Sequence, residues 1–163
     1  MTALPGALTI RRGAAGFTAW DELLALILAS FAWMEGRIDP PSSALKLSAE
    51  GLRAKCTVET PFLAFLDGRL VGCAFLAERT DHFYLGKLAV APGLQGRGIG
   101  RALLAAAEEL ALAAGKPAIV LETRVELVEN HAAFARLGFR ETGRGAHPGF
   151  DRPTSLTMRK VLG

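Results

Sequence analysis

The stretch VAPGLQGRGIGRALL, residues 90–104, places four glycines between an apolar run and a run with helical periodicity. A turn from a strand into a helix exposes unpaired N–H groups at the helix N-terminus, and the helix dipole adds positive potential there. Gly96, Gly98 and Gly100 leave the backbone bare, so a phosphate can approach it closely. The stretch therefore predicts an anion site. The simpler alternative is a glycine-rich turn that only reverses the chain.

Two common nucleotide-binding designs fit these glycines poorly. A Walker loop needs Gly-Lys followed by Ser or Thr, and the sequence contains none. A dinucleotide fingerprint needs a third glycine at position 101, where Arg101 stands, although the acidic Glu122 follows about twenty positions on. The glycines also follow a predicted antiparallel meander, whereas a Rossmann unit begins with parallel strands. A dinucleotide-binding oxidoreductase therefore stays the less favoured alternative.

The composition indicates one globular domain over residues 1–163, because 50% of the residues are hydrophobic and 21% are charged. The net charge of +3 is scattered, so we predict no nucleic-acid partner. The most apolar run, residues 23–34, is shorter than the roughly 20 residues that span a bilayer, and no secretory signal pattern precedes it, so we predict no membrane contact. Cys56 and Cys73 lack metal-ligand spacing, which favours reduced thiols in a cytoplasmic protein.

The hydrophobic periodicity predicts an α+β fold, a mixed sheet layered with helices. Thr18 is predicted to cap the first helix, and Asp67 with Gly68 to form a hairpin turn. The predicted order is strand, two helices, three strands, helix, strand, helix, two strands. Strands are predicted at 8–12, on both sides of the 67–68 turn, and at 82–91, 118–123, 139–143 and 154–160, and helices at 18–34, 44–56, 99–114 and 126–137.

Two motifs carry a resemblance to a known family. Residues 95–100, QGRGIG, have the form Gln/Arg-x-x-Gly-x-Gly/Ala and follow the predicted strand KLAVAP. Residues 130–139, NHAAFARLGF, form a predicted helix with a Gly-Phe ending. Both motifs, and the element order along nearly the whole chain, resemble the GCN5-related N-acetyltransferase (GNAT) superfamily. The resemblance implies a mostly antiparallel sheet with one splayed parallel strand pair, flanked by about four helices, and a homodimer.

The resemblance further implies acetyl-CoA, or a related acyl-CoA, as cosubstrate. No pair of histidines stands at metal-ligand spacing, so we predict no metal. Backbone N–H groups of residues 97–101 would hold its diphosphate, Gln95 would help to form the turn, and the preceding strand would pair with the pantetheine arm. For Arg136, a solvated helix charge is an equal alternative. The implied cofactor-binding residues are Leu88, Ala89, Val90, Gln95, Gly96, Arg97, Gly98, Ile99, Gly100, Arg101, Asn130, Phe134 and Arg136.

The implied reaction is transfer of the acetyl group to a primary amine by direct attack on the thioester. An amine of pKa about 10.4 is mostly protonated at pH 7, so a base or a lowered pKa is needed. The resemblance makes the Leu88 amide the oxyanion donor. Tyr84 and Glu122 are the candidate bases, and Tyr84 stands where some relatives, including histone acetyltransferases, carry a glutamate. The structural alternatives are that Tyr84 is a half-buried strand aromatic and that Glu122 is a carboxylate paired with Arg124.

One position departs from the family pattern. Many relatives place a tyrosine four residues before the glycine of Gly-Phe, where it protonates the CoA thiolate, and this chain has Phe134 there. A CoA-binding regulatory or structural protein without turnover is therefore a further alternative. The acceptor, a small-molecule or peptide amine, would bind between the loops 34–43 and 143–153, the second of which contains His147.

Overall fold

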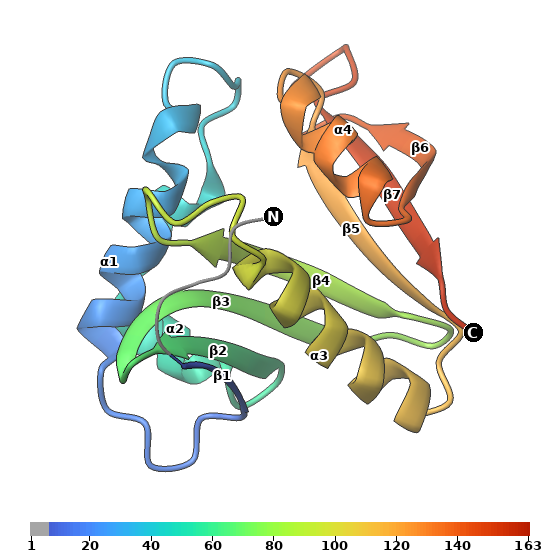
Figure 1. The fold of residues 1–163 in the computed structure, drawn as a ribbon. Coiled ribbons are helices and arrows are strands. Elements are labelled where there is room, and N and C mark those ends of the chain that lie inside the picture. Colours follow the sequence, from blue (N-terminus) through green and yellow to red (C-terminus); the bar gives the residue numbers. More distant parts are fainter. Residues whose placement is uncertain (1–6) are drawn as a thin grey trace.

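The sheet of the computed structural model, which describes residues 7–163, has seven strands in the order β1-β2-β3-β4-β5-β7-β6. All neighbouring pairs are antiparallel except β4–β5, which is parallel (Figure 1). The predicted α+β class, with one parallel pair in a mostly antiparallel sheet, is confirmed. The strands are β1 Leu8–Arg12, β2 Thr60–Leu66, β3 Arg69–Glu78, β4 Phe83–Val90, β5 Ala118–Arg124, β6 Arg140–Gly145 and β7 Ser155–Val161.

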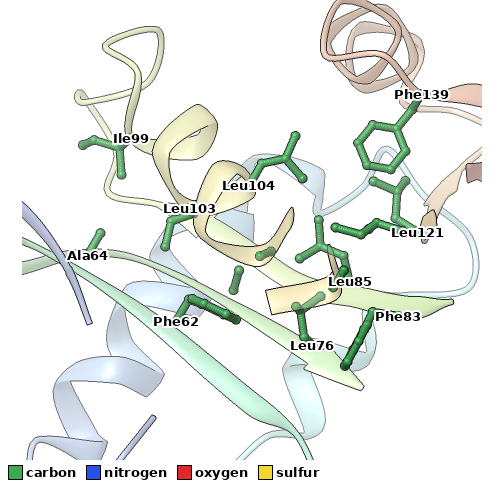
Figure 2. Close-up of a cluster of buried hydrophobic side chains, with 14 of the residues drawn as sticks. Phe62, Ala64, Leu76, Phe83, Leu85, Ile99, Leu103, Leu104, Leu121 and Phe139 are labelled. Carbon is green, nitrogen blue, oxygen red and sulfur yellow. The ribbon is translucent and has the colours of Figure 1, made fainter. Parts of the chain in front are cut away.

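Helices cover both faces of the sheet because strand side chains alternate between two buried clusters. Phe62 of β2 packs in the cluster that includes Leu103 of α3, whereas the next residue, Leu63, packs with Leu23 of α1. Figure 2 shows the first cluster, with the α3 side chains directed at the strands. The helices are α1 Trp20–Phe31, α2 Ala49–Lys55, α3 Ile99–Ala113 and α4 Val128–Arg136, with 3-10 helices η1 Ala32–Met34 and η2 Ser43–Lys46.

Two helix predictions are wrong in detail. Thr18 does not cap α1; the N-cap is Ala19, without a side-chain cap bond, and the perpendicular ring contact between Phe17 and Trp20 at 4.8 Å anchors the start of the helix instead. The predicted helix 44–56 is interrupted at Ser48, whose backbone is extended and whose hydroxyl accepts the Gly51 N–H at 2.9 Å. A serine that caps a new helix cannot also continue an old one, so η2 and α2 are separate.

The chain reverses at Asp67 and Gly68 between β2 and β3, as predicted. Both residues have positive φ angles, 50° and 82°, which is the conformation of a type I′ hairpin turn. The Asp67 carboxylate also accepts the N–H of Ala7 at 3.0 Å, which ties the start of β1 to this turn. Antiparallel strands β2, β3 and β4 thus precede the glycine stretch.

The parallel pair β4–β5 separates soon after it forms. Only Phe83↔Ile119 and Tyr84↔Val120 are paired, whereas β5 pairs with β7 along its whole length. The sheet therefore opens between β4 and β5, which diverge toward the end of β4 that leads into α3 (Figure 1). This opening positions the candidate site.

Replacing Gly72 with alanine is expected to destabilise the protein by about 1–3 kcal/mol. A Cβ at this position would lie 3.0 Å from Ile99 Cγ2 and 3.1 Å from the Ala89 carbonyl oxygen, so α3 must shift away from β3. The matched control is Gly143→Ala, whose Cβ would meet nothing within 4 Å. Urea denaturation of both variants measures the difference, and equal midpoints would show that α3 accommodates the extra methyl group.

Candidate active site

The N-terminus of α3 is an uncapped helix end. Gly98 is its N-cap, in the left-handed region with φ 91°, and the first helical bond runs from Ala102 N–H to Gly98 O at 2.9 Å. The amides of Ile99, Gly100 and Arg101 precede that bond and have no intrahelical partner. No side chain among the described residues caps them, and the first turn contains no acidic residue. These amides therefore form a positive site for an anion.

Gly100 is not required by the packing of the chain. Its φ is not positive, and a Cβ added to it would have Val90 Cγ2 as its nearest neighbour, at 3.9 Å, which is an ordinary contact. The Ile99 side chain, by contrast, is 1% exposed in the core beside Gly72, so only its backbone can face a ligand. Bare backbone at Gly100 leaves space for a group from outside the chain.

The Gln95 side chain holds the turn together from inside. Its Oε1 accepts the Gly93 N–H at 2.9 Å, and its Nε2 donates to the Val90 carbonyl at 3.5 Å. The Val90 N–H donates to Ser30 Oγ of α1 at 3.3 Å. The Val90 N–H is thus already used within the chain, so a pantetheine arm would pair with Val90 through the second lone pair of its carbonyl or by exchange with Ser30.

A β-bulge lies where β4 leaves β5. The β3–β4 register runs from Cys73↔Ala89 to Phe75↔Gly86, so that Lys87 and Leu88 together oppose one residue. Lys87 has a φ of 50°, which is unusual for a residue other than glycine. Bulges redirect a strand and its side chains beside functional sites. This bulge places Leu88 at the opening of the sheet, and its role as oxyanion donor stays a prediction.

One cavity of about 450 Å³ occupies the opening between β4 and β5. Five of the residues singled out in the sequence line it: Tyr84, Leu88, Glu122, Asn130 and Phe134. The glycine turn and the exposed Arg136 do not line it. The predicted catalytic residues are thus together, and the anion site of α3 lies apart from them. The exposed position of Arg136 is that of a solvated helix charge, and its contact with the cofactor stays a prediction.

Tyr84 is held in its protonated form. Burial raises the pKa of its phenol to about 12, and the nearby charge of Glu122 acts in the same direction. The Arg79 guanidinium lies 5.9 Å from the ring centroid and opposes this shift. At neutral pH the hydroxyl can donate a hydrogen bond, but it is a poor proton acceptor.

The carboxylate of Glu122 is not paired with Arg124, so that structural alternative is wrong. The Arg124 guanidinium instead donates to the carbonyls of Pro40 and Pro41, at 2.6 and 3.1 Å. Among residues 7–163, Glu122 takes part in no ion pair. Glu122 therefore keeps its capacity to accept a proton at the cavity.

Several lining residues were not singled out in the sequence. Lys55, Glu59, Arg79 and Lys87 line the same cavity, although they come from separate elements and no local motif connects them. The predicted acceptor loops both reach it, through Ile38, Ser42 and Ser43 of the first loop and His147 of the second. The N–H of His147 is bound by Thr154 Oγ1 at 2.8 Å, which fixes the second loop.

Other chemistries find little support in the part of the chain that the structure covers. Burial raises the pKa of the Cys73 thiol to about 12 and that of the Cys56 thiol to about 11, so neither is a ready nucleophile. Residues 7–163 contain no cluster of three or more potential metal-ligating side chains. Over the same residues, no helix combines the length and apolar character that crossing a bilayer requires.

Comparison with known proteins connects this geometry to a family. The sequence model described as "Acetyltransferase (GNAT) family" matches residues 20–139. A protein of Azospirillum brasilense named IAA acetyltransferase is 37% identical over 112 residues, which are 65% of this chain and 72% of the relative. An aminoglycoside N(6′)-acetyltransferase type 1 of Stenotrophomonas maltophilia is 39% identical over 87 residues, 48% of this chain and 57% of the relative.

Solved structures agree on the fold. The crystal structure of PaiA N-acetyltransferase from Thermoplasma acidophilum, in complex with coenzyme A, superposes with a TM-score of 0.80 at 19% identity, over 96% of this chain and 99% of that chain. An IAA acetyltransferase from Bacillus cereus superposes with a TM-score of 0.67 at 21% identity, over 96% of this chain and 100% of that chain. With its split β4–β5 pair, its glycine turn and the match over residues 20–139, this chain belongs to the GNAT family of acetyltransferases.

Proposed function

We propose that the chain is a single-domain N-acetyltransferase, over residues 1–163, that transfers the acetyl group of acetyl-CoA to a primary amine. The observation that carries this proposal is the combination of an uncapped α3 N-terminus with a cavity in the split between β4 and β5. The named N-acetyltransferase and the coenzyme A complex among the relatives support the choice of acceptor and donor. The two free thiols, Cys56 and Cys73, support a cytoplasmic location, and the homodimer follows from the family resemblance alone.

The diphosphate of the donor would bind the free amides of Ile99, Gly100 and Arg101. The fit rests on three features of this end of α3: unpaired N–H groups, no competing acidic side chain, and open space above Gly100. The pantetheine arm would then run between β4 and β5 toward Leu88. Asn130 and Phe134 line the cavity from the α4 side.

Glu122 would serve as the general base, taking the proton of the acceptor amine directly or through a water. The Leu88 amide would donate a hydrogen bond to the oxygen that becomes negative during attack. Tyr84 would keep its proton and orient the amine by a hydrogen bond. The new C–N bond forms as the C–S bond breaks, so no covalent intermediate with the enzyme is needed.

The CoA thiolate would receive its proton from water. Phe134 has no proton to give, although it occupies the position of the family tyrosine. Tyr84, with a pKa of about 12, is about 3.5 units above a thiol of pKa about 8.5, so protonation by Tyr84 is uphill by about 5 kcal/mol. The thiolate can instead leave without a proton donor on the enzyme, because at a pH below its thiol pKa of about 8.5 it takes up a proton from the solvent at equilibrium.

Binding and turnover test the proposal separately. Acetyl-CoA at 100 times its Kd is expected to raise the Tm by about 5–10 °C, whereas NAD should leave it unchanged. Release of free thiol in the presence of a primary-amine panel, followed with a thiol reagent, then measures transfer. A Tm raised by NAD instead would favour the dinucleotide alternative. Acetyl-CoA binding without thiol release on any amine would favour a CoA-binding regulatory protein.

A further inference from the structure

The acceptor side of the cavity carries an excess of positive charge. Its lining includes four basic side chains, Lys55, Arg79, Lys87 and Arg124, and two carboxylates, Glu59 and Glu122. Burying like charges together is costly unless a partner of opposite charge is supplied. The balance therefore depends on which of these cations are already neutralised within the chain.

Only one of the four cations has an anionic partner among the described residues. Lys55 Nζ lies 2.7 Å from Glu59 Oε2. Lys87 Nζ donates to a neutral hydroxyl, Ser43 Oγ, at 2.8 Å, and Arg79 donates to the Glu78 carbonyl at 3.3 Å. As described above, Arg124 bonds two backbone carbonyls. The half-buried Lys87 and the exposed Arg79 thus share the cavity lining with one unpaired carboxylate, Glu122, whereas the carboxylates of Asp39 and Glu126 act on Arg124 from outside that lining.

Lys87 is the cation best placed to meet an acceptor. It sits in the β4 bulge, next to Leu88, and the bulge directs its side chain to Ser43 of the acceptor loop. Burial lowers the pKa of its amine, and the charge of Lys55 lowers it further. An anionic group in the cavity would relieve both effects, since it would replace lost solvation and offset the neighbouring charge.

A second, apolar cavity adjoins this charged one. It has a volume of about 330 Å³ and shares Phe31, Met34, Ile38 and Ser42 with the first. Its remaining lining includes Leu28, Leu45 and one carboxylate, Glu35, and no cation contributes to it. An acceptor that fills both cavities needs an apolar body as well as charge.

We propose that the acceptor is an amphipathic amino acid: a primary amine that bears an acidic group, carboxylate or phosphonate, and an apolar side chain. Its amine faces Glu122, its acidic group binds Lys87 with Arg79 or Arg124 nearby, and its apolar body occupies the second cavity. This assignment rests on the proposed function. Polyamines fit poorly, because their additional ammonium groups would meet the unpaired cations.

The test compares acceptors that differ only in the acidic group. L-phenylalanine, its phosphonic-acid analogue and L-phenylalaninamide are offered with acetyl-CoA, together with the same acid and amide pair of leucine, and spermidine as the polyamine. We expect kcat/KM for the better acid to exceed that for its amide about tenfold or more, as for a charged hydrogen bond. The amine of the amide is less basic, so a larger fraction of it is unprotonated and able to attack at neutral pH. A preference for the acid therefore cannot arise from the availability of the free amine. The phosphonate arm shows which anion is preferred.

Lys87→Gln should remove most of this preference, lowering kcat/KM for the acid about tenfold more than for the amide. Lys46→Gln is the matched control, because Lys46 is exposed on η2 and lines neither cavity. Arg79→Gln replaces Lys87→Gln if the latter does not fold. An acetyl-CoA Kd equal to that of the unmodified protein shows that a variant is folded.

Three results overturn the assignment while leaving the proposed function in place. The first is that an amide or spermidine is acetylated as well as the acids. The second is that Lys87→Gln and Arg79→Gln keep the preference for an acid over its amide. The third is that the protein binds acetyl-CoA but acetylates none of the acids. Failure of acetyl-CoA to bind at all would instead overturn the proposed function. The acetyl-CoA Kd, together with thiol release on the wider primary-amine panel, therefore distinguishes the two failures.

Discussion

Replacing Gly100 with glutamate is expected to make the protein more stable while weakening its binding of acetyl-CoA by at least about a hundredfold. Glycine costs nearly 1 kcal/mol in a helix relative to good helix formers, and a carboxylate in the first turn gains about 0.3–1 kcal/mol from the helix dipole. The structure has space for the new side chain, because a Cβ at this position makes only an ordinary contact with Val90. The free energy of unfolding should therefore rise by about 1 kcal/mol.

The same carboxylate would stand among the amides proposed to hold the diphosphate. Two unit charges about 4 Å apart near a protein surface repel by about 4 kcal/mol, which exceeds the roughly 2.7 kcal/mol that a hundredfold loss of affinity represents. Calorimetric titration with acetyl-CoA and urea denaturation measure the two effects on one preparation. A substitution that lowered both stability and affinity could act simply by unfolding the protein. Here stability is expected to rise while affinity falls, so the loss of binding cannot be a result of unfolding.

Gly100→Ala is the matched control for this substitution. It gains helix propensity and adds a Cβ without adding charge, so it should be stabilised, and its loss of acetyl-CoA affinity measures the steric effect of the Cβ alone. If Gly100→Glu binds as tightly as Gly100→Ala, the diphosphate does not lie at the N-terminus of α3. The proposed placement of the donor, with its diphosphate on α3 and its arm between β4 and β5, would then have to be abandoned.

Glu122→Gln is expected to lower kcat about a hundredfold or more, the range that general-base catalysis contributes. The amide keeps the shape of the side chain but cannot accept a proton. Because Glu122 lies in the acceptor cavity and not at the α3 turn, the Kd of acetyl-CoA should not change. Steady-state thiol release at saturating amine measures the effect.

Tyr84→Phe provides the comparison for Glu122→Gln. With a pKa raised to about 12 by burial, the Tyr84 phenol is not ionised near neutral pH, so its removal costs a hydrogen bond and not a base. We expect a loss of about tenfold, smaller than that of Glu122→Gln. A larger loss for Tyr84→Phe, with a pH dependence that disappears in that variant, would make Tyr84 the base and contradict the assignment of Glu122.

Features built from consecutive residues were predictable from the sequence. The helix start at Gly98, the bare backbone at Gly100 and the Asp67-Gly68 turn depend on local geometry, which each residue type largely determines. The same reasoning failed at Ser48, because one serine can either continue a helix or cap a new one. Local preference alone does not decide between these two states.

Features that need distant residues were not predictable in the same way. The charged lining of the acceptor cavity brings Lys55, Arg79 and Lys87 together from α2, the end of β3 and the β4 bulge. The pairing of Arg124 with two proline carbonyls, and not with Glu122, depends on a loop more than 80 residues earlier in the chain. No periodicity or spacing in the sequence records these contacts.

The sequence by itself determined the family, the α+β class and the glycine turn that begins α3, because each depends on hydrophobic period or on a short run of glycines. Tertiary structure alone decided the protonation of Tyr84, the free carboxylate of Glu122 and the positive charge of the acceptor cavity. Burial and electrostatic coupling act through space, and their strength depends on which side chains the fold brings within a few ångströms of one another.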